Sequence, residues 1–177
     1  MKVLKNSDAF QVSIKELVQT ISKKHSDFSK VAIIGIHTRG VPMARRMAEL
    51  MAEEGNKVNL GYLDINLYRD DLSEIADQPV IKETKIEFDV SDKVVYLVDD
   101  VLYTGRTIRA GMNVLFDLGR PTEVHLVVMA KRNGRELPID TEYFGLYEDT
   151  KESDNIKVKF KEIDGEDGVV LLEEGEY

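Results

Sequence analysis

The sequence contains no cysteine among its 177 residues. Disulfides, thiolate metal ligands and cysteine nucleophiles are therefore excluded. Apolar runs are also short: the longest, at residues 31–36 and 126–130, fall far below the roughly 20 residues that a membrane-spanning helix needs. Residues 1–8 are too polar for the apolar part of a secretory signal. We therefore expect a cytoplasmic protein that makes no membrane contact.

Basic residues are in the minority, because Asp and Glu total 33 against 24 for Lys and Arg, a formal net charge of −9. A net-negative chain is repelled by polyanions, so this balance argues against a general nucleic-acid or anionic-membrane binder. The hydrophobic share of 42% and the charged share of 32% are typical of a folded globular protein. The length suits one domain, and no linker or repeat interrupts it, so we expect a single domain over residues 1–177.

Strand-like and helix-like patterns alternate along the chain. Apolar residues at helical spacing predict helices that begin after Ser7 or Asp8, extend over 41–51 and extend over 108–118. Short apolar or alternating runs predict strands at 31–36, 58–68, 85–88, 94–98 and 124–130. A polar stretch at 69–82 predicts a long loop, and the patterns at 157–163 and 169–172 predict a C-terminal β-hairpin. This order favours a parallel α/β sheet.

Two adjacent carboxylates, Asp99 and Asp100, follow a buried strand and precede a turn of small residues that opens a helix. Ligands of open α/β sheets bind outside the carboxyl ends of strands. The turn at residues 104–107 offers backbone N–H groups, hydroxyls and the positive end of a helix, which together can hold a phosphate. Carboxylates beside a phosphate site fit if they hold ribose hydroxyls or Mg²⁺. The alternative is that the acid pair merely caps the following helix.

Three segments together resemble one enzyme class. Residues 94–107 resemble the phosphoribosyl pyrophosphate signature of type I phosphoribosyltransferases: a hydrophobic strand, two acids, then Thr-Gly and a hydroxyl residue. Residues 34–42 resemble the loop that grips pyrophosphate in that class, and residues 63–72 resemble the loop that closes over the reacting sugar and excludes water. Within the class, the strings at 67–72, 98–107 and 134–139 are similar to the pyrimidine operon regulatory protein/uracil phosphoribosyltransferase family, PyrR.

This resemblance implies a type I phosphoribosyltransferase fold, with a central, mainly parallel sheet flanked by helices, a hood and a C-terminal β-hairpin. It implies transfer of ribose 5-phosphate from phosphoribosyl pyrophosphate to a nucleobase, uracil, giving UMP and pyrophosphate with Mg²⁺ as cofactor. It also implies control of pyrimidine genes through leader RNA and assembly as a homodimer or homotetramer. Two alternatives stay open: an RNA-binding regulator with little or no transferase activity, and a purine phosphoribosyltransferase.

The same resemblance implies a role for each matching residue. Asp99 and Asp100 would hold the ribose hydroxyls and the metal, and Arg69 would close over them from the mobile loop. The residues implied to bind the 5′-phosphate are Tyr103, Thr104, Gly105, Arg106 and Thr107. The residues implied to bind pyrophosphate are His37, Thr38, Arg39 and Gly40. The nucleobase side is assigned to Arg132, Arg135 and Ile139.

The segments on the nucleobase side depart from the family pattern. Lys131-Arg132-Asn133-Gly134 stands where the family usually has Asp-Arg-Gly-His, and residues 145–150 replace a Gly-Lys-Asn segment. Tyr103 stands where purine enzymes of the class have an Asp that handles a ring proton, which favours a pyrimidine. Candidate contacts to RNA are Arg45, Arg46, Arg109, Arg120, Lys131, Arg132 and Arg135, although for any one of them a solvated surface side chain is the favoured interpretation.

Overall fold

The larger of two sheets forms the centre of the molecule in this computed structural model, which describes residues 1–68 and 83–176. Its five strands are parallel and follow the order β3-β2-β4-β5-β6. They are β2 (Val31–Ile36), β3 (Asn59–Leu63), β4 (Val94–Leu102), β5 (Glu123–Arg132) and β6 (Tyr143–Glu148). Helices lie on both faces of this sheet, which explains the continuous apolar runs of its inner strands.

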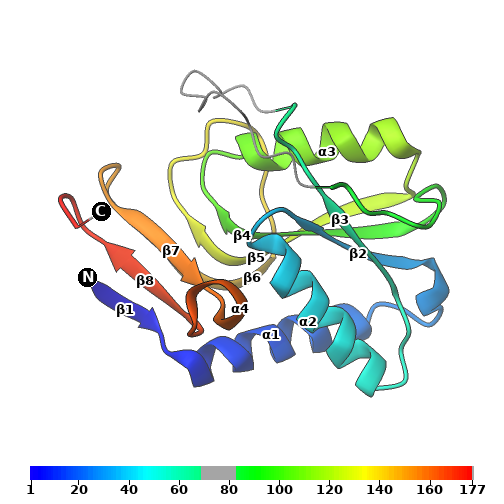
Figure 1. The fold of residues 1–177 in the computed structure, drawn as a ribbon, viewed down its shortest axis with the longest axis horizontal. Helices are drawn as coiled ribbons and strands as arrows, with labels where there is room; N and C mark the ends of the chain where they lie inside the picture. Colours follow the sequence, from blue (N-terminus) through cyan, green and yellow to red (C-terminus); the bar gives the residue numbers. More distant parts are fainter. Residues whose placement is uncertain (69–82, 177) are drawn as a thin grey trace.

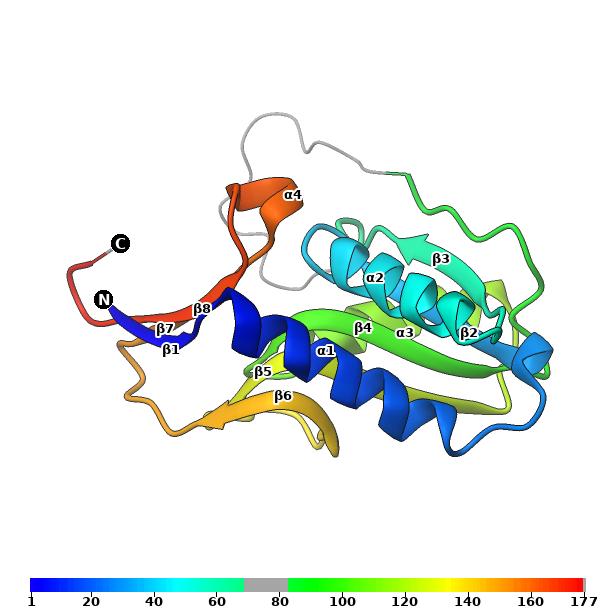
Figure 2. The ribbon, with the colours of Figure 1, turned by 90° about the horizontal axis from the view of Figure 1, so that it is seen from below.

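Two helices cover one face of the larger sheet, and a third covers the other (Figures 1 and 2). They are α1 (Ser7–Ser22) and α2 (Gly40–Glu53) on the first face, and α3 (Arg106–Leu118) on the second. A short 3-10 helix (Phe28–Lys30) leads into β2. The N-cap of α1 is Asn6, whose side chain accepts the Ala9 N–H at 2.9 Å, one residue earlier than the sequence pattern predicts.

A second, three-stranded antiparallel sheet has the order β1-β8-β7. Its strands are β1 (Lys2–Lys5), β7 (Asn155–Lys159) and β8 (Gly168–Leu172), and the short helix α4 (Lys161–Asp164) connects β7 to β8. Figures 1 and 2 place this sheet beyond the carboxyl ends of the large-sheet strands. We call β1, β7, α4 and β8 the hood. The predicted parallel α/β sheet with a C-terminal hairpin is confirmed.

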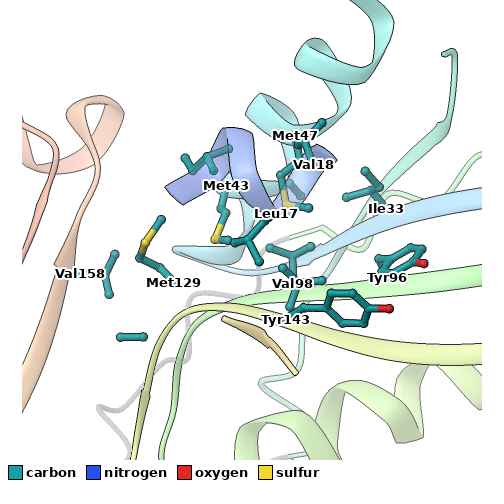
Figure 3. Close-up of a cluster of buried hydrophobic side chains, with 14 of the residues drawn as sticks. Leu17, Val18, Ile33, Met43, Met47, Tyr96, Val98, Met129, Tyr143 and Val158 are labelled. Atoms are coloured by element: carbon teal, nitrogen blue, oxygen red, sulfur yellow. The ribbon is translucent and has the colours of Figure 1, made fainter. Parts of the chain in front are cut away.

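The main core lies between the large sheet and the helices α1 and α2 (Figure 3). Met43 and Met47 of α2 are fully buried and pack toward Val98 of β4 and Met129 of β5. Val158 of β7 belongs to the same cluster, so the hood shares this core. Each fully buried side chain of this size contributes roughly 1.5–3 kcal/mol relative to an exposed one. The position of the hood over the large sheet is therefore fixed by packing as well as by backbone connection.

A second apolar cluster fills the space between the sheet and α3. Ile108 and Leu115 of α3 meet Ile36 of β2 and Leu97 of β4 there. This packing orients the first turn of α3 toward the carboxyl end of β4. Among the described residues, no helix combines the length and apolar character needed to span a bilayer.

Several predicted boundaries are wrong. The strand predicted at 58–68 ends at Leu63, because Asp64 folds back to accept the Asn66 N–H at 3.0 Å and starts a turn. Of the strand predicted at 85–88, only an isolated bridge between Lys85 and Tyr62 forms. The strand predicted at 157–163 ends at Lys159, and the next residues form α4.

Two strands, β1 and β6, were not predicted, and β4 runs further than expected, through the acid pair to Leu102. The loop predicted at 69–82 lies outside the described residues.

Candidate active site

The acid pair lies in the C-terminal half of β4. The Asp99 residue is buried, with 6% of its surface exposed. Its Oδ1 accepts the Asp100 N–H at 2.9 Å, and Oδ1 of Asp100 accepts the Val101 N–H at 2.8 Å. Burial raises the pKa of the Asp100 carboxyl above its ordinary value of 3.8, against the opposing effects of the Val101 N–H and the Arg39 charge. A carboxylate in this state gains from any cation or hydroxyl donor placed beside it.

A phosphate-sized recess follows the acid pair. Residues 101–108 line a cavity of about 350 Å³ between the end of β4 and the start of α3. Gly105 makes the turn with φ +93°, a conformation that side chains with a Cβ rarely adopt, and Thr104 Oγ1 accepts the Arg106 N–H at 3.3 Å. The first turn of α3 lies at this recess, and the positive end of its helix dipole stabilises an anion there.

The loop at residues 37–40 joins β2 to α2 and lies directly against β4. A Cβ added to Gly40 would lie 2.2 Å from the Val98 carbonyl oxygen, so only glycine permits this approach. The His37 N–H donates to the Leu63 carbonyl at 2.8 Å, which ties the loop to the next strand as well. Arg39 Nε lies 4.0 Å from Asp100 Oδ2. Two sequence motifs about 60 residues apart thus meet at one edge of the sheet, as expected for neighbouring parallel strands.

The guanidinium of Arg39 has a second carboxylate partner that sequence reasoning missed. Its Nη1 and Nη2 donate to Oδ2 and Oδ1 of Asp164 at 2.5 and 3.1 Å. Asp164 ends α4, so this ion pair connects the hood to the loop at residues 37–40. In the sequence, Asp164 stands among turn-forming residues, and a carboxylate in a polar turn carries no signal of a distant arginine partner.

On the nucleobase side, Arg132 is buried with 3% of its surface exposed. Its guanidinium donates to the carbonyls of Asp154 at 2.6 Å and Lys151 at 2.8 Å, and it lies 4.0 Å above the centre of the Tyr103 ring. Arg135 donates to the Tyr103 carbonyl. Both arginines therefore brace the recess from behind, with these donors committed to backbone carbonyls.

The loop that follows β5 contacts the turn at residues 104–106. The N–H groups of Glu136 and Leu137 donate to the Thr104 carbonyl at 3.0 and 3.2 Å. The Ile139 side chain packs on Gly105, where an added Cβ would lie 3.4 Å from it. Arg106 reaches back to the same loop, with Nε 2.6 Å from Glu136 Oε2.

The two segments that depart from the family pattern are hydrogen-bonded to each other. Asn133 Nδ2 donates to the Thr150 carbonyl at 2.9 Å, and Asn133 Oδ1 accepts the Thr150 N–H at 2.9 Å. The loops after β5 and β6 are thereby joined side by side. The departures at 131–134 and 145–150 thus form one continuous structural unit at the rim of the site.

The remaining residues predicted to bind the substrate or RNA lie in different parts of the molecule. Arg69 lies outside the described residues. Lys131 pairs with Asp140 at 2.6 Å. Arg46 is engaged with the hood through Asp167 at 2.8 Å. Within the part of the chain that is described, His, Asp and Glu form no group of three or more able to hold a metal by themselves.

The fold is that of a type I phosphoribosyltransferase. Residues 2–162 match the family model for the phosphoribosyl transferase domain. The chain is 47% identical over 169 residues to the bifunctional protein PyrR of Deinococcus radiodurans, covering 95% of this chain and 92% of that protein. It is 46% identical to the bifunctional protein PyrR of Thermus thermophilus, with 96% and 94% covered. The chain belongs to the PyrR family of phosphoribosyltransferases.

Solved structures agree on the fold. A hypoxanthine phosphoribosyl transferase of Trypanosoma cruzi superposes with a TM-score of 0.73, covering 97% of this chain and 91% of that chain at 14% identity. A purine phosphoribosyltransferase of Pyrococcus horikoshii superposes at 0.58, covering 80% of this chain and 83% of that chain at 23% identity. At this level of identity the likeness concerns the fold alone. The predicted family and fold class are both confirmed.

Proposed function

We propose that this chain transfers ribose 5-phosphate from phosphoribosyl pyrophosphate to uracil, giving UMP and pyrophosphate. The observation that carries this proposal is the close approach of Gly40 to Val98. It brings a loop suited to pyrophosphate against the acid pair of β4, next to a recess suited to a phosphate. A donor with a phosphate at one end, a ribose in the middle and a pyrophosphate at the other matches that order.

In this proposal, each loop holds one part of the donor. Residues 103–107 bind the 5′-phosphate with backbone N–H groups, hydroxyls and the helix dipole. Residues 37–40 bind pyrophosphate, with the Arg39 guanidinium as a charged donor. Asp99 and Asp100 accept hydrogen bonds from the ribose hydroxyls. Arg69, predicted to complete the site, lies outside the described residues.

Magnesium fits the acid pair. Mg²⁺ is usually bound through one or two carboxylates together with substrate phosphates and waters, and Asp99 and Asp100 supply the carboxylates. When bound, the ion offsets the negative charge that develops on the leaving pyrophosphate.

The chain itself acts by positioning. The bond from ribose C1′ to pyrophosphate breaks, the bond from C1′ to the nucleobase nitrogen forms, and the proton on that nitrogen is released. The loops at residues 37–40 and 103–107, together with the acid pair, hold C1′ in line between the two groups, which lowers the barrier without a covalent enzyme intermediate. Closure of the site over the sugar excludes water, which would otherwise compete as the nucleophile.

A panel of nucleobases tests the activity and its substrate. The purified chain is incubated with phosphoribosyl pyrophosphate and Mg²⁺, and separately with uracil, hypoxanthine, guanine, xanthine or adenine. Formation of UMP, with the highest kcat/KM for uracil, is expected. Turnover with a purine alone would refute uracil as the substrate and favour the purine alternative. No turnover with any base would refute the transferase proposal.

Neutralising the acid pair tests the assigned roles. The double variant Asp99→Asn plus Asp100→Asn should lower kcat/KM by at least about 100-fold, the size seen when oriented charge is removed from a transition state. The matched control is Asp89→Asn plus Asp92→Asn, two exposed carboxylates at the opposite end of β4. The control should keep its activity. Unchanged turnover in the acid-pair variant would overturn the assignment.

A second function, binding of pyrimidine leader RNA in response to a uridine nucleotide, is favoured by the relatives' name, bifunctional protein PyrR. Two candidate arginines, Arg45 and Arg120, are exposed. Arg46 and Arg132 are largely committed inside the protein. Filter binding of the organism's own leader RNA should show an affinity that rises with UMP and falls with salt. An affinity that depends on neither would refute this function.

The proposal includes a cytoplasmic location and a homodimer or homotetramer. Light scattering on the purified chain, with and without UMP, measures the oligomeric state directly, and a monomer at micromolar concentration would contradict this part.

A further inference from the structure

Arg39 lies between two carboxylates that come from different parts of the fold. On one side, Asp164 of the hood accepts two hydrogen bonds from Nη1 and Nη2, at 2.5 and 3.1 Å. On the other side, Asp100 of β4 lies 4.0 Å from Nε. The three side chains are 26%, 13% and 23% exposed for Arg39, Asp164 and Asp100 respectively, so solvent screens this arrangement only in part.

Asp164 is itself held firmly. Its Oδ2 accepts the Phe160 N–H at 3.0 Å across α4, and Lys157 Nζ lies 3.8 Å from Oδ1. The hydrogen bonds from Arg39 lower the pKa of the Asp164 carboxyl, so it stays ionised near neutral pH. The hood therefore presents a fixed negative charge to the loop at residues 37–40.

We propose that Asp164 is a positioning residue for the donor: it holds the Arg39 guanidinium away from Asp100 and oriented toward pyrophosphate. The inference rests on the proposed function. A guanidinium has five N–H donors, and the pair with Asp164 uses two, so three remain for phosphate oxygens. A flexible arginine held in place in this way loses less freedom when the anion binds.

Without the Asp164 charge, Arg39 has one carboxylate left nearby. The guanidinium then moves from 4.0 Å into contact with Asp100. In that contact the Arg39 guanidinium is no longer available to the pyrophosphate, and the Asp100 carboxylate is no longer available to the ribose. Donor affinity should therefore fall.

The hood offers a matched control. Asp167 is a second partly buried aspartate of the same turn, and it pairs with Arg46 of α2 at 2.8 Å. Asp167→Asn weakens an ion pair between hood and helix of the same kind but leaves Arg39 and Asp164 in place. An effect caused only by loosening of the hood would appear in both variants.

The experiment measures the Kd for phosphoribosyl pyrophosphate by calorimetry in Mg²⁺ buffer, together with thermal melts and separate values of KM and kcat. Asp164→Asn should raise the Kd about tenfold, the size of a charge-assisted contact, while Asp167→Asn changes it less than about twofold. In Asp164→Asn only, the KM for phosphoribosyl pyrophosphate should rise by more than kcat falls. Asp164→Ser repeats the test with a second neutral side chain in case the amide variant melts early.

A double variant tests whether the effect of Asp164 depends on Arg39. Arg39→Lys cannot form two parallel bonds to a carboxylate, so adding Asp164→Asn to it should change the Kd by less than about twofold. If the wild-type chain does not bind the donor, the proposed function and this inference fail together. If the wild type binds and Asp164→Asn behaves like Asp167→Asn, only the inference is overturned. Tighter binding in Asp164→Asn would also overturn it, because Asp164 would then compete with pyrophosphate for Arg39.

Discussion

Replacing Gly40 by alanine should separate the loop at residues 37–40 from β4. The added Cβ would lie 2.2 Å from the Val98 carbonyl oxygen and 3.2 Å from the Asp99 Cα. Ordinary van der Waals contact between such atoms begins near 3.4 Å, so loop and strand must move apart by about 1 Å. Both neighbours are backbone atoms, which cannot rotate out of the way as a side chain does.

A displacement of that size affects stability and activity by different amounts. Overpacking at a tight contact costs about 1–3 kcal/mol, which in a chain of this length lowers Tm by roughly 2–12 °C. The folded fraction therefore stays high at assay temperature. A misplacement of about 1 Å in a positioned site can cost about 100-fold in rate, so kcat/KM for phosphoribosyl pyrophosphate should fall by that factor.

The control is Gly55→Ala, just beyond the other end of α2. Gly55 has φ +83° with open space around it, so alanine there is strained by roughly 1–2 kcal/mol but meets no neighbour. It should lower Tm and leave kcat/KM unchanged. If Gly40→Ala retained kcat/KM within threefold of wild type, the contact with β4 would not be what assembles the site.

Two further predictions concern stability. His25 is hydrogen-bonded to Tyr96, and burial lowers its pKa below the ordinary 6.5. Because this histidine resists protonation in the folded state, its contribution to the free energy of unfolding should be complete above pH 6.5 and decline as the pH falls below that value. His25→Gln should flatten that part of the Tm profile, and an unchanged profile would contradict the assignment. Arg132→Ala removes the buried guanidinium that donates to two backbone carbonyls and stacks on Tyr103, and should cost about 2–4 kcal/mol in urea unfolding. Arg45 is exposed, so Arg45→Ala should lower the free energy of unfolding by less than about 0.5 kcal/mol. Equal losses of unfolding free energy in the Arg132→Ala and Arg45→Ala variants would refute this prediction.

The strands and helices with strong local patterns could be predicted from the sequence. The runs at 31–36 and 94–98 are buried on both faces, so composition alone marks them as central strands. The strand β1 has four residues and exists because it pairs with β8, some 165 positions away. No local pattern carries that information. The alternation of apolar and polar residues after Leu63 predicts a continued strand. The strand ends there because the Asp64 side chain accepts a backbone N–H that would otherwise be available for strand pairing.

The clustering of the candidate site residues could be predicted where they lie in continuous motifs. The acid pair, the turn at Gly105 and the loop ending at Gly40 each occupy a few consecutive residues beside a strong strand, and the resemblance named them. The partners of Arg132 and Arg39 were not predictable, because they lie 19–125 residues away and consist of two carbonyls and one turn carboxylate. An arginine near a site suggests a ligand contact, and only the folded chain reveals which arginines are already satisfied.

The pairing of β1 with β8 has a consequence for synthesis on the ribosome. β1 cannot pair until β8 has been synthesised, which at about 5–20 residues per second takes roughly 10–30 s. During that interval the large sheet can already be complete, because β6 ends at Glu148. The hood closes afterwards, and with it arrives Asp164. On the proposed role of Asp164, the site would reach its full donor affinity only once the hood has closed.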